Sequence, residues 1–203
     1  MDNHILKLPF IFDKKKLIED LSQVNESFLV KHPNTNYPTP LFSKMSYIPK
    51  ILENFKTKIE AVRFMNLKAN SQIKEHCDRE SYLEKGFIRI HIPISTNEKV
   101  KFILDSIEEK LELGCCYYIN ADKPHCIENL GTTDRIHLLI DCKVNGWLKQ
   151  LFYNQGFVEE KSLYNNHISD ENIDDVIKNL KLMNTIVPDK LIKDFEKMRD
   201  RQC

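Results

Sequence analysis

His76 and Asp78 flank a single cysteine, and a third residue of a metal-binding type, His125, lies on a later segment of the chain. Alternate residues of a β-strand point to the same face, so His76 and Asp78 would face one ion together if they lie in a strand. Two imidazoles and one carboxylate are the ligands of non-heme Fe(II) oxygenases, and they leave about three positions open on an octahedral ion. The spacing therefore predicts an iron site at His76, Asp78 and His125.

Arg135 is the residue that could hold an organic acid beside such a metal. It begins an alternating segment, where its side chain shares a face with His137 and not with the apolar residues Ile136, Leu138 and Ile140. Two interpretations are open: an ion pair at a strand end with Asp134 or Asp141, or a bidentate contact to a bound carboxylate. A buried guanidinium without an anionic partner is costly, and a bound dicarboxylate would supply that partner.

The elements that must position these residues are short β-strands. Between positions 60 and 144 we expect strands at 61–67, 72–77, 86–94, 100–107, 112–119, 125–129 and 135–144. Many short strands without intervening helices favour a sandwich or a barrel. In the segment 87–94 the isoleucines share one face, which leaves Arg89 and His91 together on the other.

Helical patterns flank this β-rich region. A strand at 5–12 precedes a helix that Asp13 would cap, and Pro49 suits the first turn of another helix. Beyond Asn145, apolar stripes at helical spacing begin at Trp147, Ile173 and Leu191. The expected fold is mainly β, a jelly-roll-like, cupin-like core with flanking helices. We expect this core and its N-terminal helices in residues 1–145 and a helical segment in 146–203.

Composition excludes several classes of protein. Lys and Arg number 30 and Asp and Glu number 30, so no excess of positive charge favours a nucleic acid as partner. No apolar run approaches the roughly 20 residues of a membrane span, and no signal peptide is recognisable. None of the six cysteines forms a CxxC pair, so we interpret them as reduced thiols and expect a cytoplasmic protein. The C-terminal stripes either pack on the core or form a homodimer contact.

Several motifs, taken in order, resemble the aspartyl/asparaginyl β-hydroxylase family of 2-oxoglutarate oxygenases. The resemblance covers about 80 residues, and its pieces are Ile73-Lys74-Glu75-His76-Cys77-Asp78, Arg89-Ile90-His91-Ile92-Pro93-Ile94, Leu113-Gly114, His125-Cys126-Ile127-Glu128-Asn129 and Arg135-Ile136-His137-Leu138. It implies a double-stranded β-helix fold, a ferrous ion, O2, and 2-oxoglutarate as co-substrate.

The resemblance also assigns roles to individual residues. His76, Asp78 and His125 match the iron ligands, and Arg135 matches the arginine that binds the distal carboxylate of 2-oxoglutarate. Arg89 and His91 match an RxH pair that contacts the substrate carboxylate or the near carboxylate of 2-oxoglutarate; we expect His91 on the co-substrate and Arg89 on the substrate. Arg63, on an earlier strand, would add a substrate contact.

Asp78 separates two branches of that family. The animal members lack a carboxylate ligand at this position, whereas the bacterial proline cis-hydroxylase-like members have one. The resemblance therefore implies hydroxylation of a free amino acid such as proline, coupled to decarboxylation of 2-oxoglutarate to succinate. One alternative is hydroxylation of Asp or Asn residues in a peptide or protein. Others are a cupin-type metalloenzyme that does not use 2-oxoglutarate and a non-catalytic jelly-roll binding protein.

Overall fold

The chain divides into two compact units, Met1–Val158 and Glu159–Cys203. The structure is a computed structural model, and it describes residues 4–23, 44–78, 83–158, 173–182 and 189–200. Helix α3, Gly146–Asn154, belongs to the first unit, whereas the sequence-based division placed it in the C-terminal segment. Its contacts with strand β1, Ile5–Ile11, explain why it stays with the β-core.

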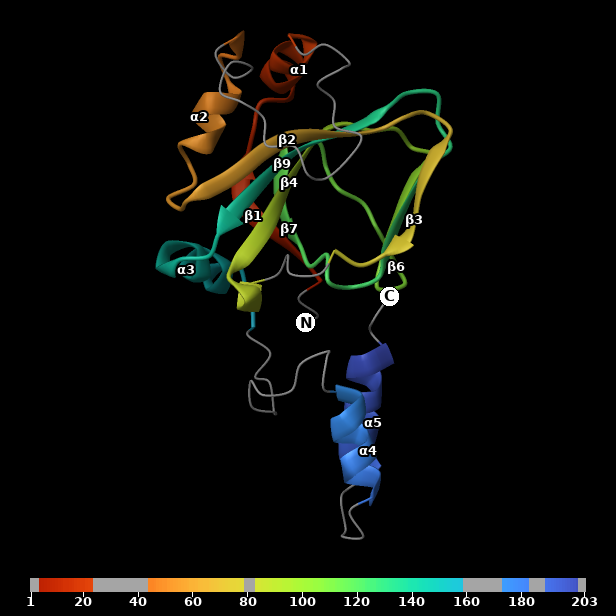
Figure 1. Ribbon diagram of the computed structural model, residues 1–203. Coiled ribbons are helices and arrows are strands. Elements are labelled where there is room, and N and C mark those ends of the chain that lie inside the picture. The colour runs from red at the N-terminus through yellow and green to blue at the C-terminus, as the bar shows by residue number, and fades with distance from the viewer. Residues whose placement is uncertain (1–3, 24–43, 79–82, 159–172, 183–188, 201–203) are drawn as a thin grey trace. The chain divides into compact units, whose positions relative to one another are not determined.

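Two antiparallel sheets form the first unit (Figure 1). The larger sheet has the order β1-β7-β4-β9-β2, and it adds to β1 the strands β7 Cys115–Ile119, β4 Phe87–Ser95, β9 Arg135–Lys143 and β2 Ile59–Leu67. The smaller sheet has the order β3-β8-β5-β6, with strands β3 Ser71–His76, β8 His125–Asn129, β5 Val100–Leu104 and β6 Ile107–Glu109. This arrangement is the expected double-stranded β-helix.

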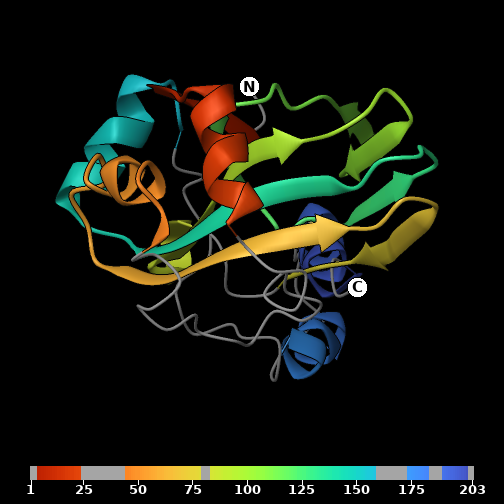
Figure 2. The same cartoon turned by 90° about the horizontal axis from the view of Figure 1, so that it is seen from above.

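Helices cover the outer face of the larger sheet (Figure 2). They are α1 Lys14–Ser22, α2 Ile48–Leu52 and α3. Asp13 caps α1 by accepting hydrogen bonds from the amides of Lys15 and Lys16, as the sequence predicted. The buried Asp20 carboxylate accepts three more, from the backbone amides of Ser46, Tyr47 and Ile48, and so ties α1 to α2.

The two faces of β4 serve two different interiors. Its four isoleucines are at most 2% exposed and belong to the core between the larger sheet and the helices, with Leu17, Ile51, Leu148 and Phe152. A smaller apolar cluster, which includes Leu67, Phe102, Tyr117 and Ile127, fills part of the space between the sheets. Arg89 and His91 face that inner space, as alternation predicted.

Two predicted strands are shorter than expected, and backbone conformation explains both. The segment 100–107 turns into a hairpin because Asp105 and Ser106 have φ angles of 49° and 68°. Positive φ angles lie in the left-handed region, which breaks the extended conformation and so ends the strand. Neither of these residues is a glycine, so the sequence contains no clear sign of the turn. Strand β7 begins only at Cys115 because Gly114, with φ 76°, turns the chain just before it.

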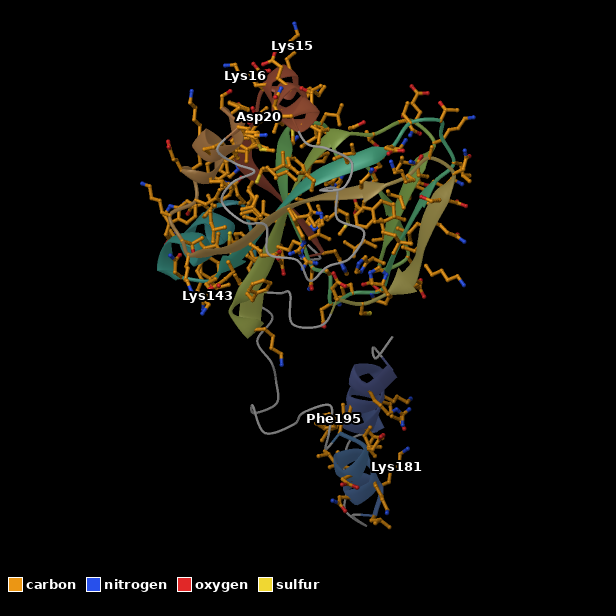
Figure 3. The ribbon with its side chains drawn as sticks, turned by 45° about the horizontal axis from the view of Figure 1, so that its top comes forward. Lys15, Lys16, Asp20, Lys143, Lys181 and Phe195 are labelled. Atoms are coloured by element: carbon orange, nitrogen blue, oxygen red, sulfur yellow. The ribbon has the colours of Figure 1, made fainter. Side chains whose placement is uncertain are left out.

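The second unit contains helices α4 Ile173–Leu182 and α5 Asp189–Asp200. Ile173 and Ile177 pack against Phe195 of α5, which Figure 3 labels. The Lys181 ammonium donates a hydrogen bond of 2.6 Å to the Glu196 carboxylate. These contacts hold the two helices together as an antiparallel-type pair with its own small core.

Cysteine chemistry differs from the expectation at one position. Cys115, Cys116, Cys126 and Cys142 are free thiols, but Cys77 takes part in a disulfide, so the prediction of reduced thiols is wrong there. Cys77 lies between two residues that point inward, and its own side chain therefore points away from them and is available for such a bond. Cys203 lies outside the described residues. No helix in the described part of the chain is long and apolar enough to cross a membrane.

Candidate metal centre

The three predicted metal ligands come together at one end of the space between the sheets. Strand β3 ends at His76 and strand β8 begins at His125, and these two residues are direct cross-strand partners. Their ring centroids lie 4.2 Å apart. Asp78 follows two residues beyond His76, where its backbone amide donates to the Ala121 carbonyl over 2.7 Å. One ligand atom from each of the three lies within 4.8 Å of the others.

Hydrogen bonds fix the orientation of both imidazoles. Nδ1 of His76 lies 2.8 Å from the carbonyl oxygen of Lys74, and Nδ1 of His125 lies 2.9 Å from that of Lys123. A carbonyl only accepts, so Nδ1 carries the proton in each ring and Nε2 keeps a free lone pair. Burial lowers the pKa of His125, which favours the neutral ring that a metal requires. Two such nitrogens and one carboxylate suit a first-row transition metal.

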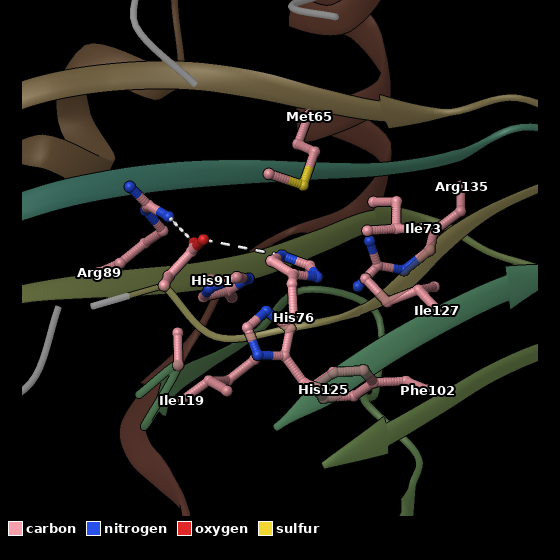
Figure 4. A pocket seen from close by; sticks show the side chains of 12 residues that line it. Met65, Ile73, His76, Arg89, His91, Phe102, Ile119, His125, Ile127 and Arg135 are labelled. Atoms are coloured by element: carbon pink, nitrogen blue, oxygen red, sulfur yellow. Dashed lines mark hydrogen bonds and ion pairs between the residues drawn. The ribbon is translucent and has the colours of Figure 1, made fainter. Parts of the chain in front are cut away.

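A pocket opens beside these ligands, and Figure 4 shows its lining. Six of the seven predicted site residues line it: His76, Asp78, His125, Arg89, His91 and Arg135. The other walls are apolar and come from several strands, namely Met65, Ile73, Phe102, Ile119, Ala121 and Ile127. These apolar residues could not be identified from the sequence, because alternation alone does not show which inner positions lie near the metal ligands.

Arg63 and Arg89 are both paired with acidic side chains. The Nε of Arg89 donates to Oδ1 of Asp141 over 2.8 Å, and its Nη1 donates to Oδ2 of Asp78 over 2.7 Å. Arg63 donates from Nη1 to the other oxygen of Asp141. Burial lowers the pKa of Arg63, and the positive charge of Arg89 adds to this, whereas Asp141 opposes it. Nε and Nη2 of Arg63 are buried without a hydrogen-bond partner.

Arg135 stands in a different environment. Its side chain is 3% exposed, and no carboxylate among the described residues pairs with it. Its Nη2 lies 3.3 Å from Nδ1 of His137, and its Nη1 is buried with no hydrogen-bond partner. Burial lowers its pKa to about 10. Asp134, the neighbour considered as its ion-pair partner, instead accepts hydrogen bonds from Asn66 and Ala69.

Two neutral histidines accompany Arg135. Burial and the nearby arginines hold the pKa of His91 well below its usual value, and burial and Arg135 do the same for His137. Their rings meet edge to face with centroids 5.9 Å apart. Both ring nitrogens of His91 are buried without a partner. Since buried polar atoms are usually hydrogen-bonded, Arg135 and His91 present donors and acceptors that a ligand could satisfy.

The structure thus brings the predicted metal ligands, Arg89, His91 and Arg135 to one pocket, and places Arg63 behind it through Asp141. Sequence reasoning did not identify Asp141 or His137 as site residues. A signal for both was available, because alternation along the strand puts them on the same face as Arg135.

Comparisons with known proteins agree with this geometry. A family model described as aspartyl/asparaginyl beta-hydroxylase matches residues 26–144, which include every site residue named above. An L-proline cis-4-hydroxylase of Rhizobium meliloti is 25% identical over 133 residues. That match covers 64% of this chain but only 46% of the relative, so the chain spans about half the length of the curated relative.

Solved structures support the fold. A non-heme monooxygenase, ThoJ in its apo form, has a TM-score of 0.51 at 11% identity, covering 70% of this chain and 74% of its own. HygX from Streptomyces hygroscopicus with iron bound has a TM-score of 0.50 at 11% identity, covering 70% and 83%. At such low identity these likenesses show a shared architecture only, the double-stranded β-helix described above.

Proposed function

This chain belongs to the aspartyl/asparaginyl β-hydroxylase family, and on that premise we propose that it is an Fe(II)- and 2-oxoglutarate-dependent dioxygenase that hydroxylates an amino acid. The observation that carries the proposal is the presence, in one pocket, of a three-ligand metal face and a buried arginine that lacks a carboxylate partner among the described residues. A metal site alone would leave Arg135 unexplained, whereas an anionic co-substrate would complete it.

His76, Asp78 and His125 would hold the ferrous ion. Their donor set fits that ion, and both histidines already have the proton on Nδ1 and the lone pair on Nε2. Arg135 would pair with the distal carboxylate of 2-oxoglutarate, and the partnerless nitrogens of His91 would contribute a further hydrogen bond. When bound, the metal and the co-substrate would together activate O2 and couple decarboxylation to succinate with hydroxylation of a C–H bond.

The residues of this chain supply position and exclude water. The apolar side chains Met65, Phe102 and Ile127 line the pocket and reduce contact with solvent. The reaction geometry depends on the placement of the target carbon, and a misplacement of about 1 Å can cost on the order of 100-fold in rate. None of the described residues in the pocket has to act as a general base in this proposal.

A carboxylate on the substrate would find a donor at Arg89, which lines the pocket and uses only its Nε and Nη1 in the hydrogen bonds to Asp141 and Asp78. Arg63 is hydrogen-bonded to Asp141 behind the pocket and does not line it, so the geometry does not favour the expected contact between Arg63 and the substrate. We favour a free amino acid such as proline, since Asp78 completes the metal face and the curated relative is named as a proline hydroxylase. The name of the family model supports the alternative substrate, an Asp or Asn residue in a peptide or protein.

The test is a turnover screen of the whole chain, reconstituted anaerobically with Fe(II) and then supplied with O2. Succinate formation and a mass increase of one oxygen atom on the substrate are measured for the twenty free amino acids and for peptides containing Asp, Asn or Pro. We expect succinate to depend on 2-oxoglutarate and to increase with a free amino acid. Stimulation by peptides alone would refute the free-amino-acid preference.

The matched control is Asp78→Ala, which removes one metal ligand and leaves the rest of the chain unchanged. Its turnover should fall by more than the roughly 10- to 100-fold that loss of an outer-shell partner typically causes. If the wild-type chain binds iron but releases no succinate with 2-oxoglutarate, a cupin-type metalloenzyme becomes the better interpretation. Unchanged iron content in Asp78→Ala and His76→Ala would favour a non-catalytic jelly-roll protein.

A further inference from the structure

A row of alternating charges runs from the buried Arg63, inside the larger sheet, to the partly exposed metal ligand Asp78. It consists of Arg63, Asp141, Arg89 and Asp78, each hydrogen-bonded to the next. We propose that Arg89 and Asp141 are positioning residues for the metal ligand Asp78, and that they hold its carboxylate so that Oδ1 alone faces the metal. This inference rests on the metal site of the proposed function, and it concerns how the site is built.

The two oxygens of Asp78 lie in different environments. Oδ2 accepts the hydrogen bond from Nη1 of Arg89 at 2.7 Å, whereas Oδ1 lies 3.7 Å from Nε2 of His76. Dashed lines in Figure 4 mark both contacts, one leading to Arg89 and the other to His76. Oδ2 is therefore engaged by a cation, and Oδ1 is the oxygen directed toward the imidazoles. A carboxylate held in this way binds a metal through one oxygen.

Asp78 needs such support because of its place in the fold. It lies beyond the end of β3, and its side chain is 36% exposed, far more than the 5% of Asp141. Its backbone is held by the amide hydrogen bond to Ala121, but within the described part of the chain only Arg89 donates a hydrogen bond to its carboxylate. Without Arg89 the side chain would be free to rotate away from the metal or to bind it through both oxygens.

Arg89 is itself fixed by Asp141. The two residues face each other in the register of β4 and β9, and Nε of Arg89 donates to Oδ1 of Asp141 over 2.8 Å. The other oxygen of Asp141 accepts a hydrogen bond from Arg63, so both oxygens of this carboxylate are held by arginines. The guanidinium group of Arg89 therefore donates from Nε to Asp141 and from Nη1 to Asp78. A lysine would keep the charge but could not span both carboxylates with this rigid fork.

The experiment measures metal affinity and not turnover. Ni(II) and Co(II) are titrated into the metal-free full chain by calorimetry, without 2-oxoglutarate, for wild type, Arg89→Lys and Asp141→Asn. Because loss of an outer-shell partner typically costs about 10- to 100-fold in metal affinity, both variants should bind more weakly by that factor. The ligand-field absorption of the Co(II) form should also change, since the carboxylate is free to bind through two oxygens.

The matched control is Lys7→Gln, which removes a charge from an exposed ion pair with Glu112 outside the pocket. Its metal affinity should stay within about 2-fold of wild type, the usual limit for independent sites. Circular dichroism and thermal unfolding show that each variant is folded. If Asp141→Asn does not fold, Arg89→Lys decides the test, because it keeps the positive charge between the two carboxylates.

A double-mutant cycle separates positioning from a general structural effect. If Asp141 acts through Arg89, then Asp141→Asn should change metal affinity by less than about 2-fold in an Arg89→Gln background. A full additional loss in that background, or wild-type affinity and Co(II) spectrum in Arg89→Lys, would overturn the inference. The two proposals can fail separately. If the wild-type chain binds metal and the variants lose affinity as expected, but no succinate is released with 2-oxoglutarate, the proposed function is refuted and the positioning role stands.

Discussion

Arg89 and Arg135 line the same pocket, but only the guanidinium group of Arg89 is paired with carboxylates of the described residues. Arg89 donates to two carboxylates, Asp78 and Asp141, and its charge is balanced by residues of the protein itself. Arg135 is more deeply buried and has a histidine nitrogen as its neighbour, with no carboxylate paired to it in the described structure. The charge of Arg89 is paired within the protein, whereas in the proposed function the charge of Arg135 would be paired by an anionic co-substrate.

Whether a buried charge is paired helps to distinguish a residue that supports the fold from one that could bind a ligand. A buried charge that is paired contributes to a defined fold, although the pair itself adds little net stability. A buried charge that is unpaired costs stability and is kept where a ligand supplies its partner. Sites with buried unsatisfied groups are therefore the places to look for ligands, and Arg135 and His91 form such a place here.

The largest expected effect concerns Asp141, whose carboxylate is paired with two buried arginines. Asp141→Asn removes the negative charge between Arg63 and Arg89, and we expect a loss of about 3–5 kcal/mol in the free energy of unfolding of the metal-free protein. Urea denaturation measures this loss. Glu60→Gln is the matched control, because Glu60 forms a more exposed ion pair with Lys58 whose loss should cost at most about 1 kcal/mol. Equal losses in the two variants would contradict the comparison.

The next effect concerns ligand binding at Arg135, which has no carboxylate partner among the described residues. Arg135→Gln should weaken 2-oxoglutarate binding to the metal-loaded protein by about 2–5 kcal/mol, the cost of truncating one partner of a buried charge pair. Anaerobic calorimetry measures the affinity. As a control, 2-oxobutanoate lacks the distal carboxylate, so wild type should bind it more weakly than 2-oxoglutarate and the variant should bind both alike. A variant that still discriminates between them would show that another residue binds the distal carboxylate.

The same arginine should have the opposite effect on stability. Arg135→Met removes a buried donor that has no partner, so the ligand-free variant should be as stable as wild type or more stable by about 1–3 kcal/mol. Thermal unfolding without and with 2-oxoglutarate checks this: at one ligand concentration, 2-oxoglutarate should raise the melting temperature of the metal-loaded wild type more than that of the variant. A marked loss of stability in the ligand-free variant would mean that Arg135 already has its partner within the chain.

The smallest effect is the pH dependence of stability. Burial lowers the pKa of His91 and His137 in the folded protein, so the unfolded chain binds protons that the folded chain excludes. The stability of the metal-free protein is therefore fully present above the unfolded pKa of about 6.5 and falls as the pH drops below it, by up to about 1.4 kcal/mol per pH unit for each histidine. His137→Gln should reduce that slope between pH 6.5 and 5 by about one proton. An unchanged slope would show that His137 accepts a proton in the fold.

Much of this molecule follows from alternation along its strands. The inward direction of Arg89 and His91 and the outward direction of the β4 isoleucines were predictable because side-chain direction has a period of two. The pairing of Arg89 with Asp141 was not, because it depends on the register between two strands far apart in the sequence. For the same reason the apolar walls of the pocket were not predicted.

Local backbone conformation set another limit. The turn between β5 and β6 is formed by Asp105 and Ser106, and neither of them is the glycine that usually marks such a hairpin in a sequence. The assignment of α3 to the β-core depends on its contacts with β1, which lies at the opposite end of the sequence. The division of the chain at 145 and 146 remains a prediction, since helical periodicity shows that a helix exists but not what it packs against.

The pairing of His76 with His125 has a consequence for the smaller sheet. β3 is an edge strand of that sheet, with a single neighbour, β8, and the two histidines stand opposite each other at the end of this ladder. An ion bound by both rings would crosslink the edge strand to its neighbour at the point where an edge is most prone to fray. Removal of the ion by a chelator would then be felt first as faster amide hydrogen exchange along β3, while the centre of the larger sheet keeps its protection.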